Sequence, residues 1–434
     1  MLNIYPLWII QGYKYYKKTS ANLRGLFDKS YFRVWNPRFL KRSQWFSEEE
    51  IRSLQLEGLK KLVDHARKNT AYYKDLPKIS SLDDLKKIPI LTKRLIKENF
   101  DRLKVANVPG FKVATSGTVS KSTTFKDNRL KFDFAENRFL NWYRTPLNRI
   151  CELWGSIDIG LKPHQKGGQQ YLPVETLKSR EDAIHYLRLI EKFKPNLIKA
   201  YTTPLRFLAY YALEEGIQPE VGVIQTSCET LFSEARKEIE DAFQCEVYNF
   251  YGSRELGSMA QDCEMHDDLH INAERYIVEE VDGRLLFTDL LNYAMPLIRY
   301  ENQDIGKLSN RRCPCGRGLP TLNSLLGRTM DYLLTKKDTW IHVSNLCFPL
   351  PQLDIFSWVE SYQFKNYEKG KVTILLKPWT GLEKIPELDT LTKIFYERVS
   401  HDELDISIEI VDSLILSRSG KKIQVLTNFN PWDE

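Results

Sequence analysis

The sequence predicts an α/β protein, with a large domain of parallel and antiparallel sheet followed by a small C-terminal α+β domain. Three observations carry this prediction. Helical and strand-like segments alternate over 181–251, two-residue alternation with turn signals follows over 275–308, and a separate set of strand and helix patterns fills the last hundred residues. Because 434 residues exceed what one core usually serves, we expect an N-terminal helical segment (1–105), a central core (106–328) and a C-terminal domain (329–434).

The first hundred residues have a helical pattern. Apolar residues recur at three- and four-residue steps over 47–70, and Ser47 with Glu50 forms the sequence signature of a capping box. A second capped segment at 80–88 precedes the segment 89–100. We therefore expect mostly helix before the loop that starts at Ala114.

The segment 181–251 fixes the architecture of the centre. Its strands at 196–201, 221–227 and 246–251 are separated by single helices, so they must run parallel. Ligands bind beyond the carboxyl ends of such strands. The turns at those ends, 200–204, 226–231 and 251–257, are therefore expected to line one cleft.

The later segments indicate antiparallel strands and a separate domain. Alternating residues on either side of Asp282 and Gly283 predict a hairpin over 275–290, continued by 296–308. Beyond Arg328, strands are expected at 332–337, 371–378 and 405–411 and a helix at 388–399.

The net charge of +6 is concentrated at the start of the chain, where residues 1–50 hold nine Lys/Arg and four Asp/Glu. A nearly neutral body argues against nucleic acid as a partner. The aromatic, basic segment over 5–18 is either an arm packed on its own domain or a peripheral anchor at the inner membrane face, because its apolar stretch over 7–10 is too short to span. Seven irregularly spaced cysteines favour reduced thiols and a cytoplasmic protein.

The segment 114–125, ATSGTVSKSTTF, suits an anion. Its glycine lets backbone approach a phosphate, its hydroxyls can donate hydrogen bonds, and its lysine supplies charge. It lacks the Gly-Lys-Ser/Thr ending of a Walker A loop, and a surface loop rich in serine and threonine would have the same composition.

Four further motifs follow in order: YGSRELG (251–257), RYENQDIG (299–306), GRTMD (327–331) and RSGKK (418–422). Together with the loop they resemble the adenylate-forming enzyme superfamily, and in particular its phenylacetate-CoA ligase-like branch, which includes proteins of capsular polysaccharide biosynthesis. The resemblance implies that a small-molecule carboxylic acid attacks Mg-ATP, that an acyl-adenylate and pyrophosphate form, and that the acyl group then passes to a thiol, hydroxyl or amine.

The resemblance also implies a nucleotide site with a Mg²⁺ ion. It assigns nucleotide contacts to Ser116, Gly117, Thr118, Lys121, Glu229, Tyr251, Gly252, Ser253, Asp304 and Arg328. The first four would hold the β and γ phosphates, Tyr251 would lie against adenine and Asp304 would accept hydrogen bonds from the ribose. The alternatives are that Asp304 is a turn residue and that Tyr251 belongs to the hydrophobic core.

Three residues would act on the reacting groups. Glu255 would bind Mg²⁺, and Lys421 would reach the α-phosphate as a C-terminal domain turns about the junction near Arg328. Arg254 stands where the family has a threonine or serine; its guanidinium either donates to phosphate or pairs with Glu255 and closes the site. A solvated surface lysine is the alternative for Lys421.

A zinc site is also predicted. Cys263 with His266 or His270, and Cys313 with Cys315, supply three thiolates and one imidazole from segments about fifty residues apart. The branch's leucine-histidine pair favours His270. Such a set suits structural Zn²⁺, and ordinary buried thiols are the alternative.

Departures from the family bear on the acceptor. The segment 335–343 lacks the glycine that follows the hinge in CoA-using relatives, which weakens CoA and favours a sugar or lipid-linked amine or hydroxyl. The altered phosphate loop and Arg254 also leave open a noncatalytic descendant that binds a nucleotide or a biosynthetic partner. A zinc-containing nucleic-acid binder is a third hypothesis, which the neutral body opposes.

Overall fold

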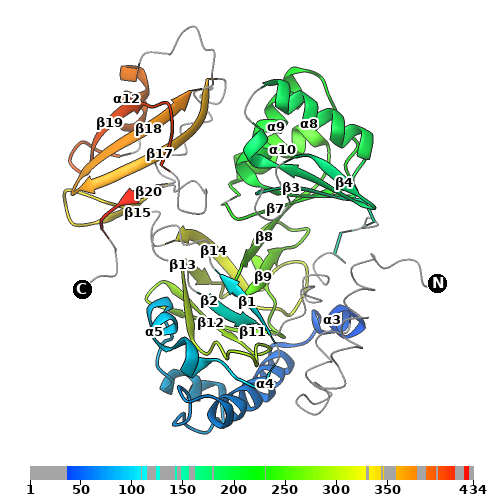
Figure 1. Ribbon diagram of the computed structural model, residues 1–434, viewed down its shortest axis with the longest axis vertical. Helices are drawn as coiled ribbons and strands as arrows, with labels where there is room; N and C mark the ends of the chain where they lie inside the picture. Colours follow the sequence, from blue (N-terminus) through cyan, green and yellow to red (C-terminus); the bar gives the residue numbers. More distant parts are fainter. Residues whose placement is uncertain are drawn as a thin grey trace.

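The computed structural model describes most of the chain. The described residues are 37–108, 110–114, 124–127, 142–143, 148–155, 162–177, 180–229, 231–328, 332–343, 346, 358–378, 388–396, 399–415 and 425–429. They form a lower lobe, an upper lobe with three helices, and a separate sheet at the C-terminal end (Figure 1). The N-terminal segment 1–36, which includes the expected packed arm or peripheral anchor over 5–18, lies outside these residues.

A twelve-stranded mixed sheet runs through the lower and upper lobes. Its order is β11-β12-β13-β14-β10-β9-β8-β7-β6-β3-β5-β4. The strands, in chain order, are β3 (Ile150–Trp154), β4 (His164–Lys166), β5 (Gln169–Pro173), β6 (Leu197–Tyr201), β7 (Val223–Ser227), β8 (Val247–Ser253), β9 (Gly257–Asp262), β10 (Leu269–Ile271), β11 (Tyr276–Val281), β12 (Arg284–Asp289), β13 (Tyr300–Leu308) and β14 (Thr321–Arg328).

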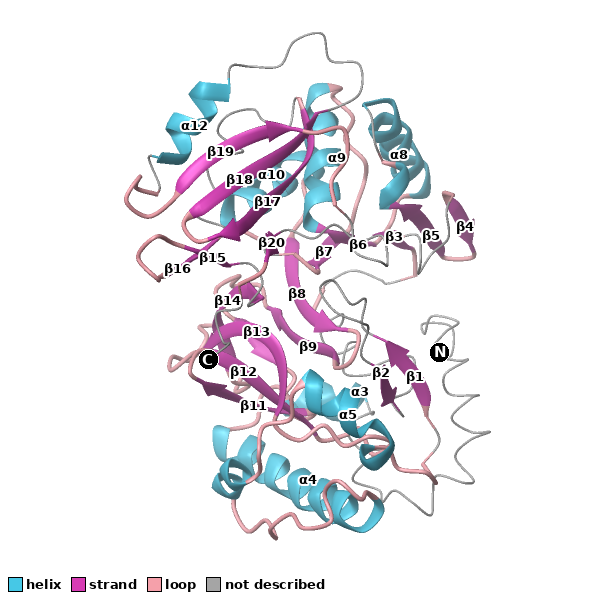
Figure 2. Cartoon of the chain, turned by 60° about the vertical axis from the view of Figure 1, so that its left-hand side comes forward, coloured by secondary structure: helices cyan, strands magenta, loops and turns pink. Residues whose placement is uncertain are grey.

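The parallel half of this sheet confirms the prediction from alternating helices and strands. β6, β7 and β8 pair in parallel and are connected by α9 (Thr202–Glu214) and α10 (Ser233–Phe243). α8 (Arg180–Phe193) leads into β6, and α9 contacts both α8 and α10 on this lobe (Figure 2). β3 adds to the same sheet in parallel with β5 and β6, and a short 3₁₀ helix, η2 (Val174–Thr176), follows β5.

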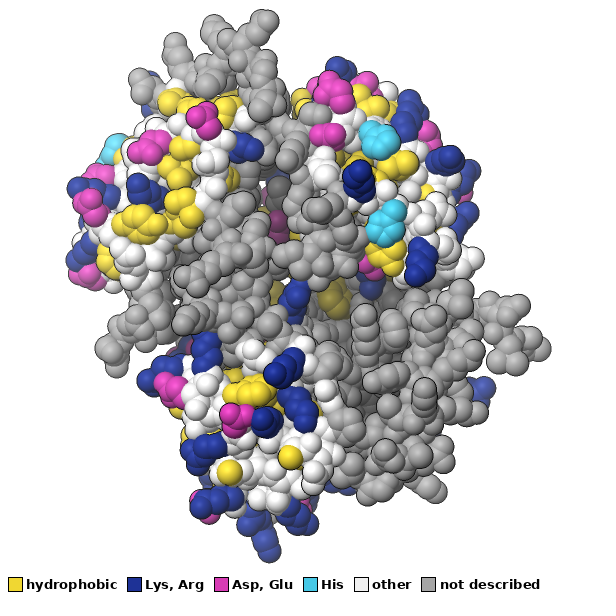
Figure 3. Space-filling view, viewed as in Figure 1, with side chains coloured by type: hydrophobic (Ala, Val, Ile, Leu, Met, Phe, Trp, Pro, Cys, Tyr) yellow, Lys and Arg dark blue, Asp and Glu magenta, His cyan; other side chains and the backbone are white. Residues whose placement is uncertain are grey.

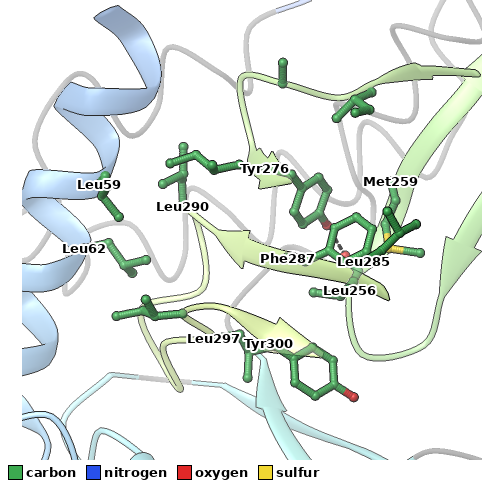
Figure 4. Packing of buried hydrophobic residues seen from close by; sticks show 14 of the residues in the cluster. Leu59, Leu62, Leu256, Met259, Tyr276, Leu285, Phe287, Leu290, Leu297 and Tyr300 are labelled. Carbon is green, nitrogen blue, oxygen red and sulfur yellow. Dashed lines mark hydrogen bonds between the residues drawn. The ribbon is translucent and has the colours of Figure 1, made fainter. Parts of the chain in front are cut away.

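The antiparallel half packs against the N-terminal helices. These are α3 (Pro37–Ser43), α4 (Glu48–Asn69), the 3₁₀ helix η1 (Leu82–Lys87) and α5 (Lys93–Leu103). α4 begins with the predicted capping box, in which Glu50 N donates to Ser47 Oγ at 3.2 Å and Ser47 N donates to the Glu50 carboxylate at 2.8 Å. Its buried residues Leu59 and Leu62 face Leu290 and Leu297 of the sheet region (Figure 4). The segment 80–88, predicted as capped, contains the 3₁₀ helix η1, at whose start Ser81 N donates to Asp84 Oδ2 at 2.9 Å.

Two small hairpins and the C-terminal sheet complete the fold. β1 (Phe111–Ala114) pairs with β2 (Thr124–Asp127), and β15 (Tyr332–Leu334) pairs with β16 (Trp340–His342). The C-terminal sheet has the order β19-β18-β17-β20, formed by β17 (Val359–Glu368), β18 (Lys371–Pro378), β19 (Asp405–Ile410) and β20 (Val425–Thr427). α12 (Leu388–Tyr396) packs on this sheet through a buried cluster that includes Leu391, Phe395 and Phe364.

The fold class predicted from the sequence, an α/β protein with a large mixed sheet and a smaller C-terminal α+β unit, is confirmed. Within the described residues, no helix is long and apolar enough to cross a membrane. The boundaries proposed at 105 and 328 stay predictions.

Candidate functional site

The turn between β8 and β9 carries the predicted metal-binding glutamate. Leu256 N donates to Ser253 Oγ at 3.1 Å within this turn. Gly252 is required for its packing, because a Cβ there would lie 2.8 Å from the Gly257 carbonyl oxygen and 2.9 Å from a carbon of the Phe250 ring. Arg254 is exposed, whereas Glu255 is only 5% exposed, so the two neighbouring charges occupy different environments.

Glu255 is held by groups from two other parts of the chain. The hydroxyl of Tyr300 donates to Glu255 Oε1 at 3.1 Å, and Lys93 Nζ lies 3.7 Å from the same oxygen. Magnesium in nucleotide-dependent enzymes is usually held by one or two carboxylates, with phosphate oxygens and water completing its shell. A single, oriented carboxylate such as Glu255 fits that requirement.

Tyr251 and Asp304, which the sequence analysis assigns to one nucleotide, meet in a buried network. Tyr251 OH donates to Asp304 Oδ2 at 2.5 Å, and Asn302 Nδ2 donates to the same oxygen at 2.5 Å and to Tyr251 OH at 2.8 Å. The backbone NH of Asp304 donates to Asn302 Oδ1 at 3.1 Å. Gln303 between them has a φ of 72°, which bends the strand locally. The sequence analysis assigns no role to Asn302, so its part in this network is a finding of the structure.

Two more predicted residues lie at neighbouring strand ends. Glu229 is exposed just beyond β7, whose Ser227 pairs with Phe250, so it follows the strand next to the one that carries Tyr251. Arg328 ends β14, and its backbone is in register with Asp304. The turns after β7 and β8 follow neighbouring parallel strands, and side-chain hydrogen bonds from Tyr251 connect β8 to β13.

The predicted phosphate-loop residues Ser116, Gly117, Thr118 and Lys121 lie outside the described residues, as does Lys421. The loop is flanked by β1 and β2, which pair with Ala114 opposite Thr124. The ring of Phe125 in β2 contacts the ring of Tyr300 edge-on at 5.7 Å, and Tyr300 in turn binds Glu255. The chain thus enters and leaves this loop beside the strand that supports the candidate metal ligand.

A second constellation lies at the far end of β9. Cys263 follows β9, His270 lies in β10, and Cys313 and Cys315 lie in the turn between β13 and β14. Their ligand atoms all lie within 4.8 Å of one another, with Cys263 Sγ 3.6 Å from Cys313 Sγ and Cys315 Sγ 3.3 Å from His270 Nε2. The pairing of β10 with both β9 and β14 brings the two halves together.

This donor set fits tetrahedral Zn²⁺. Zinc–sulfur bonds of about 2.3 Å put two thiolates about 3.8 Å apart across a tetrahedral ion, close to the Cys263–Cys313 separation. Burial raises the pKa of Cys263 and of Cys313. Burial also opposes ionisation of Cys315, but hydrogen bonds from His270 and Arg317 outweigh it and lower its pKa to about 6. His266, the other histidine considered, contacts Asp262 and Arg236 instead.

Arg317, which sequence reasoning missed, ties this cluster to the N-terminal helices. Its Nη1 donates to both carboxylate oxygens of Glu264, at 3.0 and 2.8 Å, and its guanidinium lies over the rings of Trp142 at 4.1 Å and Trp45 at 5.2 Å. Its Nε donates to Gln44 Oε1 at 2.8 Å. The local sequence gives no signal for these contacts, because these partners of Arg317 are all more than fifty residues away from it in the chain.

Comparison with known proteins gives distant relatives and a shared fold. The chain is 27% identical over 331 residues to a phenylacetate-coenzyme A ligase of Thermus thermophilus, covering 66% of this chain and 72% of the relative. It is 23% identical over 332 residues to protein CapK of Staphylococcus aureus, covering 66% and 70%. No protein-family model matches the chain.

Among solved structures, a 2-hydroxyisobutyryl-CoA ligase in its postadenylation state superposes with a TM-score of 0.69. The match covers 89% of this chain and 91% of that one, at 17% sequence identity. At this identity the superposition establishes the fold, including the small C-terminal sheet.

Proposed function

Since this chain belongs to the adenylate-forming enzyme superfamily and is a distant homologue of phenylacetate-CoA ligases and CapK, we propose that it activates a carboxylic acid with ATP. A carboxylate oxygen attacks the α-phosphorus, the bond from that phosphorus to the oxygen bridging to the β-phosphate breaks, and pyrophosphate leaves. The acyl-adenylate then donates its acyl group to an acceptor, and AMP is released.

The observation that carries this proposal is that residues of β13 take part in two side-chain networks with the end of β8 and the turn that follows it. Tyr251, Asn302 and Asp304 form one, and Glu255 with Tyr300 forms the other. Alternate residues of β13 supply Tyr300, Asn302 and Asp304, so a single strand connects both networks. In the proposed site Asp304 accepts hydrogen bonds from ribose, and Tyr251 lies against adenine.

Glu255 is the proposed ligand of Mg²⁺. When bound, the ion would neutralise charge on the phosphates and on the developing pyrophosphate. Tyr300 keeps the carboxylate oriented through its hydroxyl, and the buried position of Glu255 limits competing water. Ser116, Gly117, Thr118, Lys121 and Lys421 keep their proposed phosphate contacts, with Lys421 arriving as the C-terminal domain rotates.

The second half-reaction is proposed to use CoA or an amine or hydroxyl of a sugar or lipid-linked acceptor. The names of the phenylacetate-coenzyme A ligase and 2-hydroxyisobutyryl-CoA ligase relatives support CoA. The missing glycine after the hinge, over 335–343, supports the other acceptors. Formation of a CoA thioester from the adenylate, measured by mass spectrometry with and without added sugar amines, separates the two.

Carboxylate-dependent exchange of pyrophosphate into ATP tests the first half-reaction. The purified chain is screened with aryl, fatty and amino acids, and at least one class is expected to give exchange. Glu255→Gln should abolish it, whereas Glu57→Gln, which removes a surface carboxylate that is 46% exposed, should leave it unchanged. Binding of ATP without exchange for any acid would favour a noncatalytic nucleotide-binding descendant instead.

Structural Zn²⁺ is the proposed occupant of the Cys263, His270, Cys313 and Cys315 cluster. Four protein ligands close a tetrahedral shell, so this ion would stabilise the fold and would not activate water. Its support is the donor set and its spacing.

A further inference from the structure

Lys93 connects the N-terminal helices to the candidate nucleotide site. It is the first residue of α5, whose N-cap Thr92 accepts a hydrogen bond from Leu95 N at 3.3 Å. Its Nζ lies 3.7 Å from Glu255 Oε1 and 3.5 Å from the Asn302 carbonyl oxygen. Lys93 therefore contacts both the β8–β9 turn, which carries Glu255, and β13, which carries Asp304.

The backbone holds Lys93 in this position. Leu91, two residues before it, pairs with Tyr300 as an isolated bridge. Leu91 N donates to the Arg299 carbonyl at 3.0 Å, and Glu301 N donates to the Leu91 carbonyl at 2.9 Å. The start of α5 is thus hydrogen-bonded to the start of β13, and the lysine stem needs only to extend along that strand.

Helix stability does not explain a lysine here. The N-terminal end of a helix carries partial positive charge, so a cation in the first turn is unfavourable, and α5 has no acidic residue in its first turn. The compensating charge comes from Glu255 on another element. The side chains of Lys93 and Glu255 are 20% and 5% exposed, so solvent screens this pair less than a surface pair.

Other cations lie on the surface of the same lobe. In Figure 3, many Lys and Arg side chains of the visible face gather on the lower lobe, over the N-terminal helices. Lys93 differs from these surface cations because its charge is directed to a carboxylate of the site. A fixed cation beside Glu255 would attract the polyphosphate of a nucleotide and would repel a second cation.

We propose that Lys93 is a positioning residue of the nucleotide site, which holds Glu255 and supplies positive charge toward the polyphosphate of ATP. This inference rests on the function proposed above and adds an element from the N-terminal segment to it. Lys93 attracts ATP in the absence of Mg²⁺, and it weakens the binding of Mg²⁺ at Glu255 because both are cations. Removing it therefore changes nucleotide affinity in a manner that depends on the metal.

The experiment measures the dissociation constant of ATP by calorimetry, with Mg²⁺ and with EDTA, for the wild-type chain, Lys93→Met and Lys93→Arg. Loss of one charge-assisted contact in Lys93→Met is expected to weaken binding without Mg²⁺ by about tenfold. With Mg²⁺ the loss should be about threefold or less, because the ion can bind Glu255 more tightly. Lys93→Arg should keep most of the affinity under both conditions.

Arg94→Gln is the matched control. It removes one positive charge from the same helical turn, but the Arg94 side chain is 82% exposed and pairs with Glu98, so ATP affinity should change by less than about twofold. Circular dichroism and thermal melting establish that each variant is folded.

Equal affinities for Lys93→Met and the wild type, or the same loss with and without Mg²⁺, would overturn the role of Lys93 while leaving the nucleotide site intact. A wild-type chain that binds no ATP under either condition would overturn the proposed function and this inference together.

Discussion

A buried ion pair beneath the Glu255 turn gives a prediction that joins stability to function. Arg275 and Asp289 are both fully buried, and the guanidinium donates to the two carboxylate oxygens at 3.4 Å each. Arg275 Nη2 also donates to the Leu256 carbonyl at 2.7 Å, next to Glu255. Tyr276 OH donates to the same carbonyl, an interaction drawn in Figure 4. The perturbation is Arg275→Met, which keeps an unbranched side chain but replaces the charged guanidinium with an apolar end.

The expected loss of folding stability depends on the interactions that Asp289 and the Leu256 carbonyl keep in Arg275→Met. Asp289 would remain buried without its cation, and breaking a buried pair from one side costs about 3–5 kcal/mol. The backbone NH of Leu291 still donates to Asp289 at 3.1 Å, and the Leu256 carbonyl keeps the Tyr276 donor, so the lower half of this range is expected. Replacing both partners, as in Arg275→Met with Asp289→Leu, should cost about 2 kcal/mol less than the sum of the single changes.

Urea denaturation followed by tryptophan fluorescence measures these differences, with the transition midpoints compared at a common slope. Arg188→Met is the control, because its pair with Glu191 lies on the surface with side chains 58% and 43% exposed and should contribute under about 1 kcal/mol. The Michaelis constant for ATP should rise in Arg275→Met, since the Glu255 turn loses a support. A loss of stability below about 1 kcal/mol, or additive single and double changes, would refute the reasoning.

Three further predictions concern the metal cluster, the nucleotide network and pH. Cys313→Ser should lower the zinc content, measured by atomic emission, from one ion per chain to well below one; unchanged content would exclude this site. Asp304→Asn should weaken ATP binding by about tenfold or more in calorimetry, because the Tyr251 and Asn302 donors lose a charged acceptor; an effect under about twofold would contradict its role. Burial lowers the pKa of His65, whose Nε2 donates to the Tyr293 carbonyl at 3.0 Å. Because the unfolded chain takes up this proton first, near pH 6.5, the contribution of His65 to stability is present above about pH 6.5 and is lost as pH falls through its folded pKa. A His65→Gln variant should lose less stability than the wild type over that interval in thermal melting, and parallel profiles would contradict this.

The parallel half of the sheet could be predicted because its signals are local. Each helix over 180–243 has an apolar face of its own, and each strand is a short buried run, so neighbouring residues suffice to identify them.

The strand β17 was not predicted, because its local sequence does not look like that of a buried strand. Gln363 and Asn366 are fully buried there, although polar residues usually indicate a surface. Both are satisfied by backbone groups of other segments, such as the Ile415 carbonyl bound by Gln363 Nε2 at 2.9 Å and Leu334 N bound to Asn366 Oδ1 at 2.8 Å.

Some site residues could be identified from local motifs, whereas others are placed by contacts between segments distant in sequence. Tyr251, Glu255 and Asp304 lie in motifs whose order along the chain indicates a shared site, and the structure brings Tyr251 and Asp304 into direct contact. Lys93 could not be found in this manner. Its position depends on the bridge between Leu91 and Tyr300, two residues more than two hundred positions apart, and on a capped helix that by itself looks like an ordinary surface element.

The strand β9 explains why a structural metal would matter to nucleotide chemistry. It begins directly after the Glu255 turn and ends at Asp262, next to Cys263, so the two proposed sites lie at its two ends, about 20 Å apart along an extended strand. Arg275 and Tyr276 support the first end through the Leu256 carbonyl, and the thiolate cluster would fix the other. Loosening the metal end would allow β9 to shift against β8, whose register with it is already interrupted between Tyr251 and Gly252. Since Tyr251 and Glu255 flank that irregularity, loss of the ion should weaken nucleotide binding without altering any residue that touches the nucleotide.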